Sequence, residues 1–192
     1  MVTKQDLIYR QVVTLRDGTR VLLRPLTSED RQALIDLFSP ISIEEKRYFR
    51  TNVNNPEIVG GWVDALDYDK VLPIVAVFGN RIVGDVTLHF RYGPARHIAE
   101  LRIFLAKEFR HRGLGGRMLQ AIIDLAKRRN LLYIEAEVVS EQTHIIKAFH
   151  SVGFLSKCTF EDYFMLPDGE LLNLAHLVLR LRNEGVVQSE DF

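Results

Sequence analysis

The stretch from Leu105 to Gly116 carries the strongest chemical signal in the chain. It reads Leu-Ala-Lys-Glu-Phe-Arg-His-Arg-Gly-Leu-Gly-Gly and places Arg110 three residues before Gly113. Glycines let a backbone approach a ligand closely, and the free N–H groups where a helix begins favour an anion through hydrogen bonds and the helix dipole. The pattern therefore predicts a phosphate-binding loop.

The spacing of the glycines limits which phosphate ligand this loop can hold. Gly113-x-Gly115 lacks the third spaced glycine of a dinucleotide fingerprint and the Gly-Lys-Ser/Thr ending of an NTPase loop. Both of those ligand classes are disfavoured. For the motif taken alone, a glycine-rich helix start that binds no ligand is the alternative.

A strand before this loop and a helix after it would position the motif. His97 to Leu105 has apolar residues on one side, and from Leu114 onward apolar residues recur with helical spacing. Leu132 to Val139 predicts a second strand, and a shorter helix capped by Ser140 is expected after it. Strand, helix, strand implies a parallel or mixed sheet at this point.

Three hairpins account for most of the remaining chain. Asp17-Gly18, Gly79-Asn80 and Asp168-Gly169 supply the positive φ angles that tight turns need. The paired strands are predicted over 8–15 with 20–25, 71–78 with 81–90, and 156–166 with 171–180. Capping patterns at Thr27 and Ser42 predict two helices after the first hairpin.

Composition excludes several function classes. The 192 residues are 47% hydrophobic, and 25 Lys and Arg balance 25 Asp and Glu, so the chain has no global basic field for nonspecific nucleic-acid binding. The single Cys158 cannot form an internal disulfide, which favours a reducing, cytoplasmic setting. We expect no membrane span and no metal, because no apolar run is long enough and the histidines lack ligand spacing.

The order of these parts resembles the acetyl-CoA-binding half of the GNAT acyltransferase superfamily. The resemblance lies in Arg110-x-x-Gly113-x-Gly115 after a strand, then a helix, a strand, a second helix and Val152-Gly153-Phe154. It implies an α/β protein with the GNAT fold, a central mixed, mostly antiparallel sheet flanked by helices. We therefore expect one domain over residues 1–182, followed by a polar tail over 183–192.

The resemblance also implies the residues that contact acetyl-CoA. In that family the pyrophosphate lies on the N–H groups of the motif loop, and the pantetheine arm pairs with the preceding strand like an added strand. The implied contacts come from the strand, the loop and the start of the shorter helix: Ile103, Leu105, Arg110, His111, Arg112, Gly113, Leu114, Gly115, Gly116 and Gln142. Gln142 stands where an asparagine is common in the family.

A closer likeness is to the acyltransferase domain of Pat-type bacterial protein-lysine acetyltransferases. It is carried by Leu15 to Thr19, Leu23-Arg24-Pro25, Ser28-Glu29-Asp30, Arg47 to Arg50 and Ala99-Glu100-Leu101. This likeness implies that Glu100, ten residues before Arg110, is the general base that takes a proton from the acceptor amine. Partial burial beside the cofactor would raise the pKa of this carboxyl. The alternative is a strand-surface glutamate paired with Arg102.

Two further residues bear on the mechanism. Many GNAT enzymes use a tyrosine to reprotonate the thiolate of CoA, but this chain has Phe149 there, and the neighbouring His150 points about a third of a turn away on a helix. Cys158 could instead act as an acyl-accepting nucleophile, although a single cysteine in a strand is more often a small buried hydrophobe.

We therefore expect an N-acetyltransferase in which an amine, that of a protein lysine, attacks acetyl-CoA directly. A small-molecule amine acceptor, such as a polyamine, an amino acid or an aminoglycoside, and a non-catalytic acyl-CoA sensor stay open as alternatives. The acceptor pocket should come from residues 41–69 and the last hairpin. We expect no nucleic-acid or membrane partner, and a monomer or a homodimer.

Overall fold

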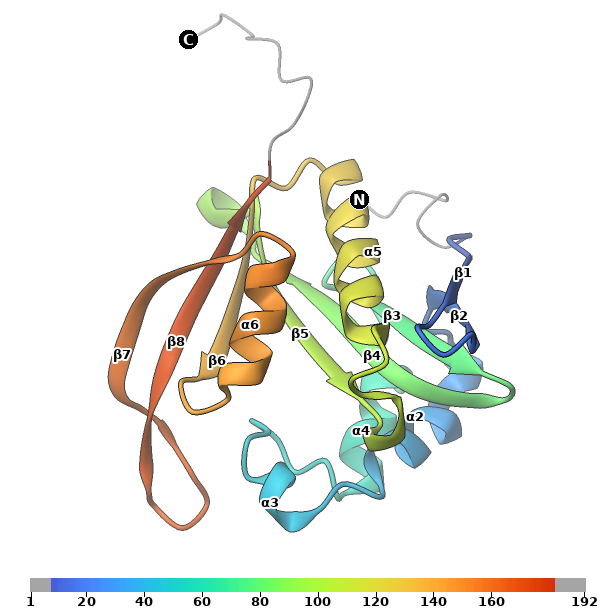
Figure 1. The fold of residues 1–192 in the computed structure, drawn as a ribbon, viewed down its shortest axis with the longest axis horizontal. Coiled ribbons are helices and arrows are strands. Elements are labelled where there is room, and N and C mark those ends of the chain that lie inside the picture. The colour runs from blue at the N-terminus through green and yellow to red at the C-terminus, as the bar shows by residue number, and fades with distance from the viewer. Residues whose placement is uncertain (1–7, 182–192) are drawn as a thin grey trace, which may run out of the picture.

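Eight strands form one sheet in the order β1-β2-β3-β4-β5-β6-β8-β7 in the computed structural model, which describes residues 8–181 (Figure 1). All neighbouring strands are antiparallel except β5 and β6, which confirms the mixed, mostly antiparallel sheet. The strands are β1 (Gln11–Thr14), β2 (Arg20–Pro25), β3 (Val71–Phe78), β4 (Arg81–Phe90), β5 (Ile98–Leu105), β6 (Tyr133–Val139), β7 (Leu155–Met165) and β8 (Leu171–Arg180).

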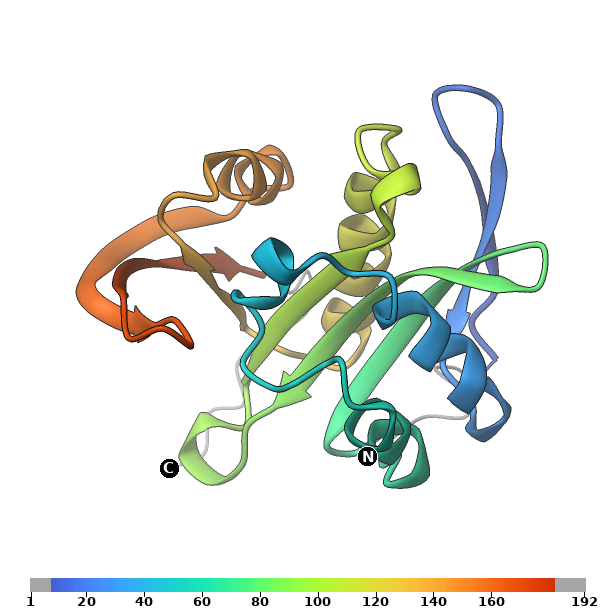
Figure 2. The same cartoon turned by 90° about the horizontal axis from the view of Figure 1, so that it is seen from below.

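Helices cover both faces of the sheet. Figure 2 shows α5 and α6 on one face and α2 and α4 on the other, while α3 lies near the gap between β5 and β6. The α-helices are α2 (Arg31–Phe38), α3 (Ile43–Lys46), α4 (Pro56–Asp64), α5 (Leu114–Arg128) and α6 (Thr143–Ser151), and the short 3-10 turns are η1 (Ser28–Asp30), η2 (Gly93–Ala95) and η3 (Lys107–Phe109).

The three predicted hairpin turns are confirmed. Gly18, Gly79 and Gly169 have φ angles of 85°, 59° and 90°, a region that side chains other than glycine rarely adopt. The bounds of β3, β4 and β8 are those expected from the sequence. β1 is shorter than predicted, because only Gln11–Thr14 pairs with β2.

The sequence analysis missed the helix α4 and assigned the N-terminal cap of α6 to the wrong residue. α4 has Asn55 as its cap, whose side chain accepts a hydrogen bond from the N–H of Glu57, and Pro56 is its first residue. That Asn-Pro pair is a helix-start signal that could have revealed α4. Ser140 does not cap α6, because the helix begins at Thr143 with Gln142 in the cap position. The predicted tail over 183–192 lies outside the described residues.

Close packing fixes α5 against the sheet and so places the motif loop at its start. The face of α5 that includes Leu114, Met118 and Ile122 is fully buried, and each such side chain contributes about 1.5–3 kcal/mol. On β4, a side-chain carbon at Gly84 would lie 2.7 Å from Leu105 Cδ2 and 2.9 Å from Met118 Sδ. A larger residue at this position would require the side chains of Leu105 and Met118 to shift.

Candidate active site

The loop between β5 and α5 has an unusual backbone. His111 and Gly113 have φ angles of 59° and 89°, both in the left-handed region. The first N–H groups of α5, including those of Leu114 and Gly115, have no acceptor within the helix. A side-chain carbon at Gly116 would meet nothing within 4 Å, so the backbone is open there. The loop can therefore bind a pyrophosphate through N–H groups and the helix dipole.

The side chain of Arg110 is already engaged within the protein. Its guanidinium donates to both carboxylate oxygens of Glu45 at 2.6 and 3.1 Å and to the carbonyl of Leu105 at 2.9 Å. This pairing lowers the pKa of Glu45. Arg110 therefore ties the loop to α3 and to the end of β5.

The side chain of Arg112 is engaged in the same way, on the opposite side of the loop. It donates to Asp17 Oδ2 at 2.6 Å, to Thr19 Oγ1 at 2.7 Å and to the carbonyl of Glu108 at 3.1 Å. Arg110 and Arg112 thus hold the loop in place. The backbone N–H groups at the start of α5 remain available to bind a ligand.

β5 and β6 are paired over only three residues and then separate. The parallel ladder joins Ile98 to Tyr133, Ala99 to Ile134 and Glu100 to Glu135, yet both strands continue beyond it, as Figure 1 shows. Ile103 and Leu105 lie in the separated part of β5. No strand pairs with this part of β5 on the β6 side, so an extended ligand could pair with it there, although the carbonyl of Leu105 already accepts from Arg110. Glu100 lies at the point where the strands part.

The carboxylate of Glu100 is surrounded by cationic groups. Glu100 Oε1 accepts from Arg102 Nε at 2.9 Å and lies 3.5 Å from Arg50 Nη1. The pairing with Arg102 is the one that the alternative interpretation of Glu100 predicted. His89, its neighbour on β4, has its pKa lowered to about 4 by burial and by Arg102, so it is neutral at pH 7.

The expected rise in the pKa of Glu100 was wrong. Burial does raise it, but the hydrogen bond and charge of Arg102, together with the charge of Arg50, outweigh that effect and leave the pKa below its ordinary value. Glu100 is 21% exposed and is ionised at neutral pH.

The face that holds Glu100 carries more acidic residues than the sequence analysis identified. Glu135 and Glu137 on β6 point to the same face as Glu100, and Glu135 pairs with Arg91 at 2.6 Å. Glu137 pairs with Arg50, which therefore bridges Glu100 and Glu137. The alternation of Glu135 and Glu137 with buried residues in the predicted strand was a signal that could have found them.

Residues 43–50, called here the α3 segment, cross the open end of the separated strands. Ion pairs tie this segment to three different parts of the protein: Glu45 to Arg110 in the loop, Arg47 to Asp168 and Glu170 in the turn before β8, and Arg50 to Glu100 and Glu137. Tyr48 packs in a small apolar cluster, and Phe49 packs edge-on against Phe104 of β5.

The residues expected on the shorter helix are placed as follows. Gln142 is the half-buried cap residue of α6, and its side chain makes no cap hydrogen bond. Phe149 is buried and packs edge-on against Phe154, so it is a core residue. His150 is exposed, with Nε2 3.0 Å from Ser156 Oγ. Neither Phe149 nor His150 is therefore positioned to donate a proton within the protein.

Cys158 on β7 is exposed, so its interpretation as a small buried hydrophobe was wrong. Among residues 8–181 no cluster of His, Cys, Asp and Glu could hold a metal ion. Across the same residues, no helix has the length and apolar character needed to cross a membrane.

The family assignment comes from a sequence match and agrees with solved structures. Residues 32–154 match the Acetyltransferase (GNAT) family, whereas no curated protein matches the chain. The GNAT domain of S. lividans PAT is 22% identical, with a TM-score of 0.76 over 94% of this chain and 100% of that one. The ribosomal-protein-alanine N-acetyltransferase from Brucella melitensis is 23% identical, with a TM-score of 0.71 over 83% and 99% of the two chains.

A third relative, yncA from Salmonella typhimurium, was solved with its cofactor acetyl-CoA. It is 18% identical, with a TM-score of 0.74 over 89% of this chain and 99% of that one. Identities this low show a shared fold, and the match over residues 32–154 shows the family. The chain is a member of the GNAT family of acetyltransferases, which are acyltransferases that use acetyl-CoA.

Proposed function

We propose that this protein transfers the acetyl group of acetyl-CoA to the side-chain amine of a protein lysine, with Glu100 as the general base. The observation that carries this proposal is the position of Glu100 where β5 and β6 separate, on a face that already holds a cation, the guanidinium of Arg50. A lysine ammonium has the same charge and needs the same carboxylate partners.

The acceptor must lose a proton before it can attack. A lysine amine has a pKa of about 10.4, so at pH 7 only about one molecule in a few thousand is the free base. Glu100 is ionised at that pH and can accept a proton directly or through one water. Acetyl-CoA supplies the activated acetyl thioester. The loop between β5 and α5 would hold its pyrophosphate through backbone N–H groups.

A small polycationic amine is the second candidate acceptor. Glu100, Glu135 and Glu137 place three carboxylates on one face, which suits a polyamine with several ammonium groups. The two candidates differ in where the acetyl group ends, and that can be measured without knowing the acceptor in advance.

The test follows a labelled acetyl group from acetyl-CoA into a desalted cell lysate supplemented with pooled metabolites. We expect label in precipitated protein, and a loss of about a hundredfold with Glu100→Gln, since general-base catalysis contributes roughly 10²–10⁴. Glu29→Gln removes an exposed glutamate of η1, outside the segments expected to form the acceptor pocket, and serves as the matched control. It should transfer label at the wild-type rate.

Three other outcomes would correct the proposal in different ways. Label only among small molecules would replace the lysine acceptor by a small amine and keep acetyl-CoA as the donor. Transfer by Glu100→Gln at the wild-type rate would remove Glu100 from the role of base. No label in either fraction, with acetyl-CoA binding intact, would favour the non-catalytic acyl-CoA sensor.

A further inference from the structure

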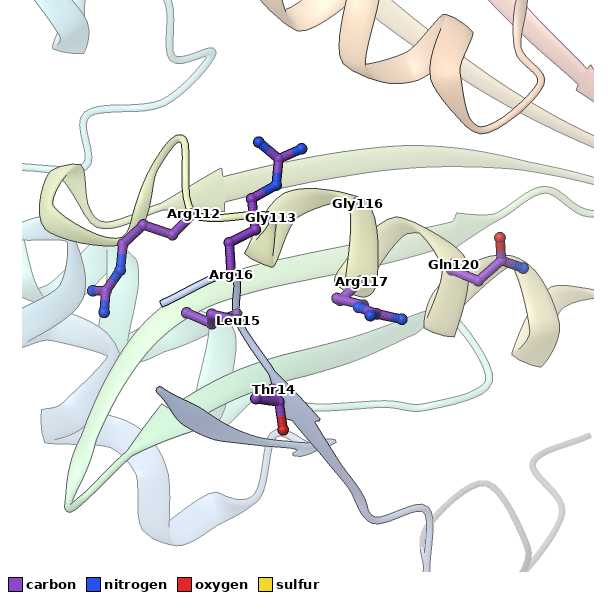
Figure 3. Close-up of a pocket in the computed structure, with 8 residues that line it drawn as sticks. All are labelled: Thr14, Leu15, Arg16, Arg112, Gly113, Gly116, Arg117 and Gln120. Carbon is purple, nitrogen blue, oxygen red and sulfur yellow. The ribbon is translucent and has the colours of Figure 1, made fainter. Parts of the chain in front are cut away.

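A cavity of about 500 Å³ lies on the side of the motif loop that faces the β1–β2 hairpin, between this hairpin and the first turns of α5 (Figure 3). Its polar lining consists of three guanidinium groups, one hydroxyl and one amide, and no carboxylate lines it. The lining residues are Thr14, Leu15, Arg16, Arg112, Gly113, Gly116, Arg117 and Gln120. A cavity with this lining selects an anion.

The wall of the cavity is preformed. Arg112 binds Asp17 and Thr19 at the tip of the hairpin, and the N–H of Arg16 donates to the carbonyl of Arg112 at 3.2 Å. The charge of Arg112 is therefore balanced by Asp17, and this arginine acts as a brace. It fixes the hairpin beside the loop before any ligand binds.

The other two arginines of the cavity differ from Arg112 in their charge environment. Within residues 8–181 neither Arg16 nor Arg117 forms an ion pair, and both are exposed at the cavity. The stem of Arg16 crosses Gly113, where a side-chain carbon would lie 3.6 Å from Arg16 Cγ. In Figure 3 the guanidinium groups of Arg16 and Arg112 point in opposite directions, that of Arg16 reaching past Gly113.

We infer that Arg16 and Arg117 form a phosphate-binding subsite that the hairpin adds to the motif loop. Two guanidinium groups can take the oxygens of a phosphomonoester through paired, charge-assisted hydrogen bonds. Residues 32–154 carry the family match, so Arg16 and the hairpin lie outside it. The phosphate comes from one of two sources: the 3′-phosphate of acetyl-CoA bound at the adjoining loop, or a separate phosphorylated small molecule. The first source rests on the proposed role of that loop.

Calorimetric titration of CoA, dephospho-CoA and adenosine 3′,5′-bisphosphate into the full chain tests this subsite. The variants are Arg16→Gln, Arg117→Gln and the double variant, with Lys127→Gln as control. Lys127 is an exposed cation at the far end of the same helix. All three substitutions replace exposed side chains, so we expect the four variants to retain the fold.

If the 3′-phosphate of CoA is the ligand, each single variant binds CoA about tenfold more weakly and the double variant about a hundredfold, since each charge-assisted bond is worth roughly a tenfold change. Dephospho-CoA then binds all variants equally. If the phosphate is separate, wild-type protein saturated with CoA still binds adenosine 3′,5′-bisphosphate, and the double variant does not.

The inference is overturned if the double variant binds CoA and adenosine 3′,5′-bisphosphate as the Lys127→Gln control does. Failure of the proposed function gives a different result. If the wild-type chain binds neither CoA nor dephospho-CoA, the motif loop is not a CoA site, yet adenosine 3′,5′-bisphosphate still reports on the arginine subsite by itself.

Discussion

The motif loop and the face around Glu100 lie next to each other but are built in different ways. The loop presents backbone N–H groups, held by left-handed residues at 111 and 113 and braced by Arg110 and Arg112. The face around Glu100 presents side chains, held by ion pairs that come from β5, β6 and the α3 segment. Backbone geometry demands particular residue types at fixed spacing, whereas an ion pair needs only charges that the fold brings together.

The largest effect should come from a substitution that blocks the backbone of the loop. In Gly115→Glu the new carboxylate would stand where an anion is to bind. We expect acetyl-CoA affinity to fall about a hundredfold or more, since placing like charges together costs several kcal/mol. Calorimetric titration measures this loss, and circular dichroism checks the fold.

Gly61→Glu is the matched control for this substitution. Gly61 lies within α4, away from the loop, and a side-chain carbon there would meet nothing within 4 Å, so acetyl-CoA affinity should stay within about threefold of wild type. Unchanged affinity in Gly115→Glu would mean that the ligand does not lie on this backbone, and the contrast between the two regions would be lost.

Asp85 is a second carboxyl on the same face of the sheet as Glu100, and it tests how strongly the pKa of a carboxyl on that face depends on cationic partners. Asp85 on β4 is partly buried, its Oδ1 is buried with no hydrogen-bond partner among the described residues, and this burial raises its pKa to about 7. Folded protein therefore holds this proton more tightly than unfolded protein. The contribution of protonated Asp85 to the stability of the folded protein is complete below about pH 4 and is lost as the pH rises through 7.

Asp85→Asn should therefore stabilise the protein at pH 8. The full shift corresponds to about 4 kcal/mol, and we expect about 2 kcal/mol to be regained, since an unpaired buried amide keeps part of the cost. Urea unfolding at pH 5 and pH 8 measures it. The wild type should lose stability between these two pH values and the variant should not. Parallel curves for the two proteins would show that Asp85 keeps its charge in the fold.

The difference between the two regions also explains what could be predicted from the sequence. The hairpins, α5 and the loop were predicted because glycines with positive φ and helical periodicity leave a local pattern. The pairing of Arg50 with Glu137 joins residues 87 positions apart, and nothing local marks it. The lowered pKa of Glu100 was missed for the same reason, since the contribution of Arg50 comes from a distant segment.

Arg50→Ala tests whether the guanidinium of Arg50, in the α3 segment, occupies the position where the ammonium group of the acceptor would bind. Arg50 contacts both Glu100 and Glu137, so its removal should free Glu137 and leave Glu100 paired with Arg102 alone, which makes room for a cationic acceptor. We expect KM for a lysine peptide or for spermidine to fall about fivefold, a modest effect because the pair is partly exposed. The release of CoA thiol measures turnover. Arg47→Ala loosens the same segment at the turn before β8 and should leave KM unchanged. A higher KM in Arg50→Ala would mean that Arg50 positions the acceptor.

The smallest effect should come from Glu45→Gln, which releases Arg110 from α3. If backbone N–H groups bind the pyrophosphate, freeing this guanidinium should change acetyl-CoA affinity by less than about twofold, and the free energy of unfolding should fall by about 0.5 kcal/mol because the ion pair is about one-third exposed. Glu44→Gln, the neighbouring exposed glutamate, is the control. A tenfold gain in affinity with Glu45→Gln alone would show that the Arg110 side chain binds phosphate once released. The loop would then bind its ligand through a side chain, as the face around Glu100 does. Glu45 would compete with the ligand for Arg110.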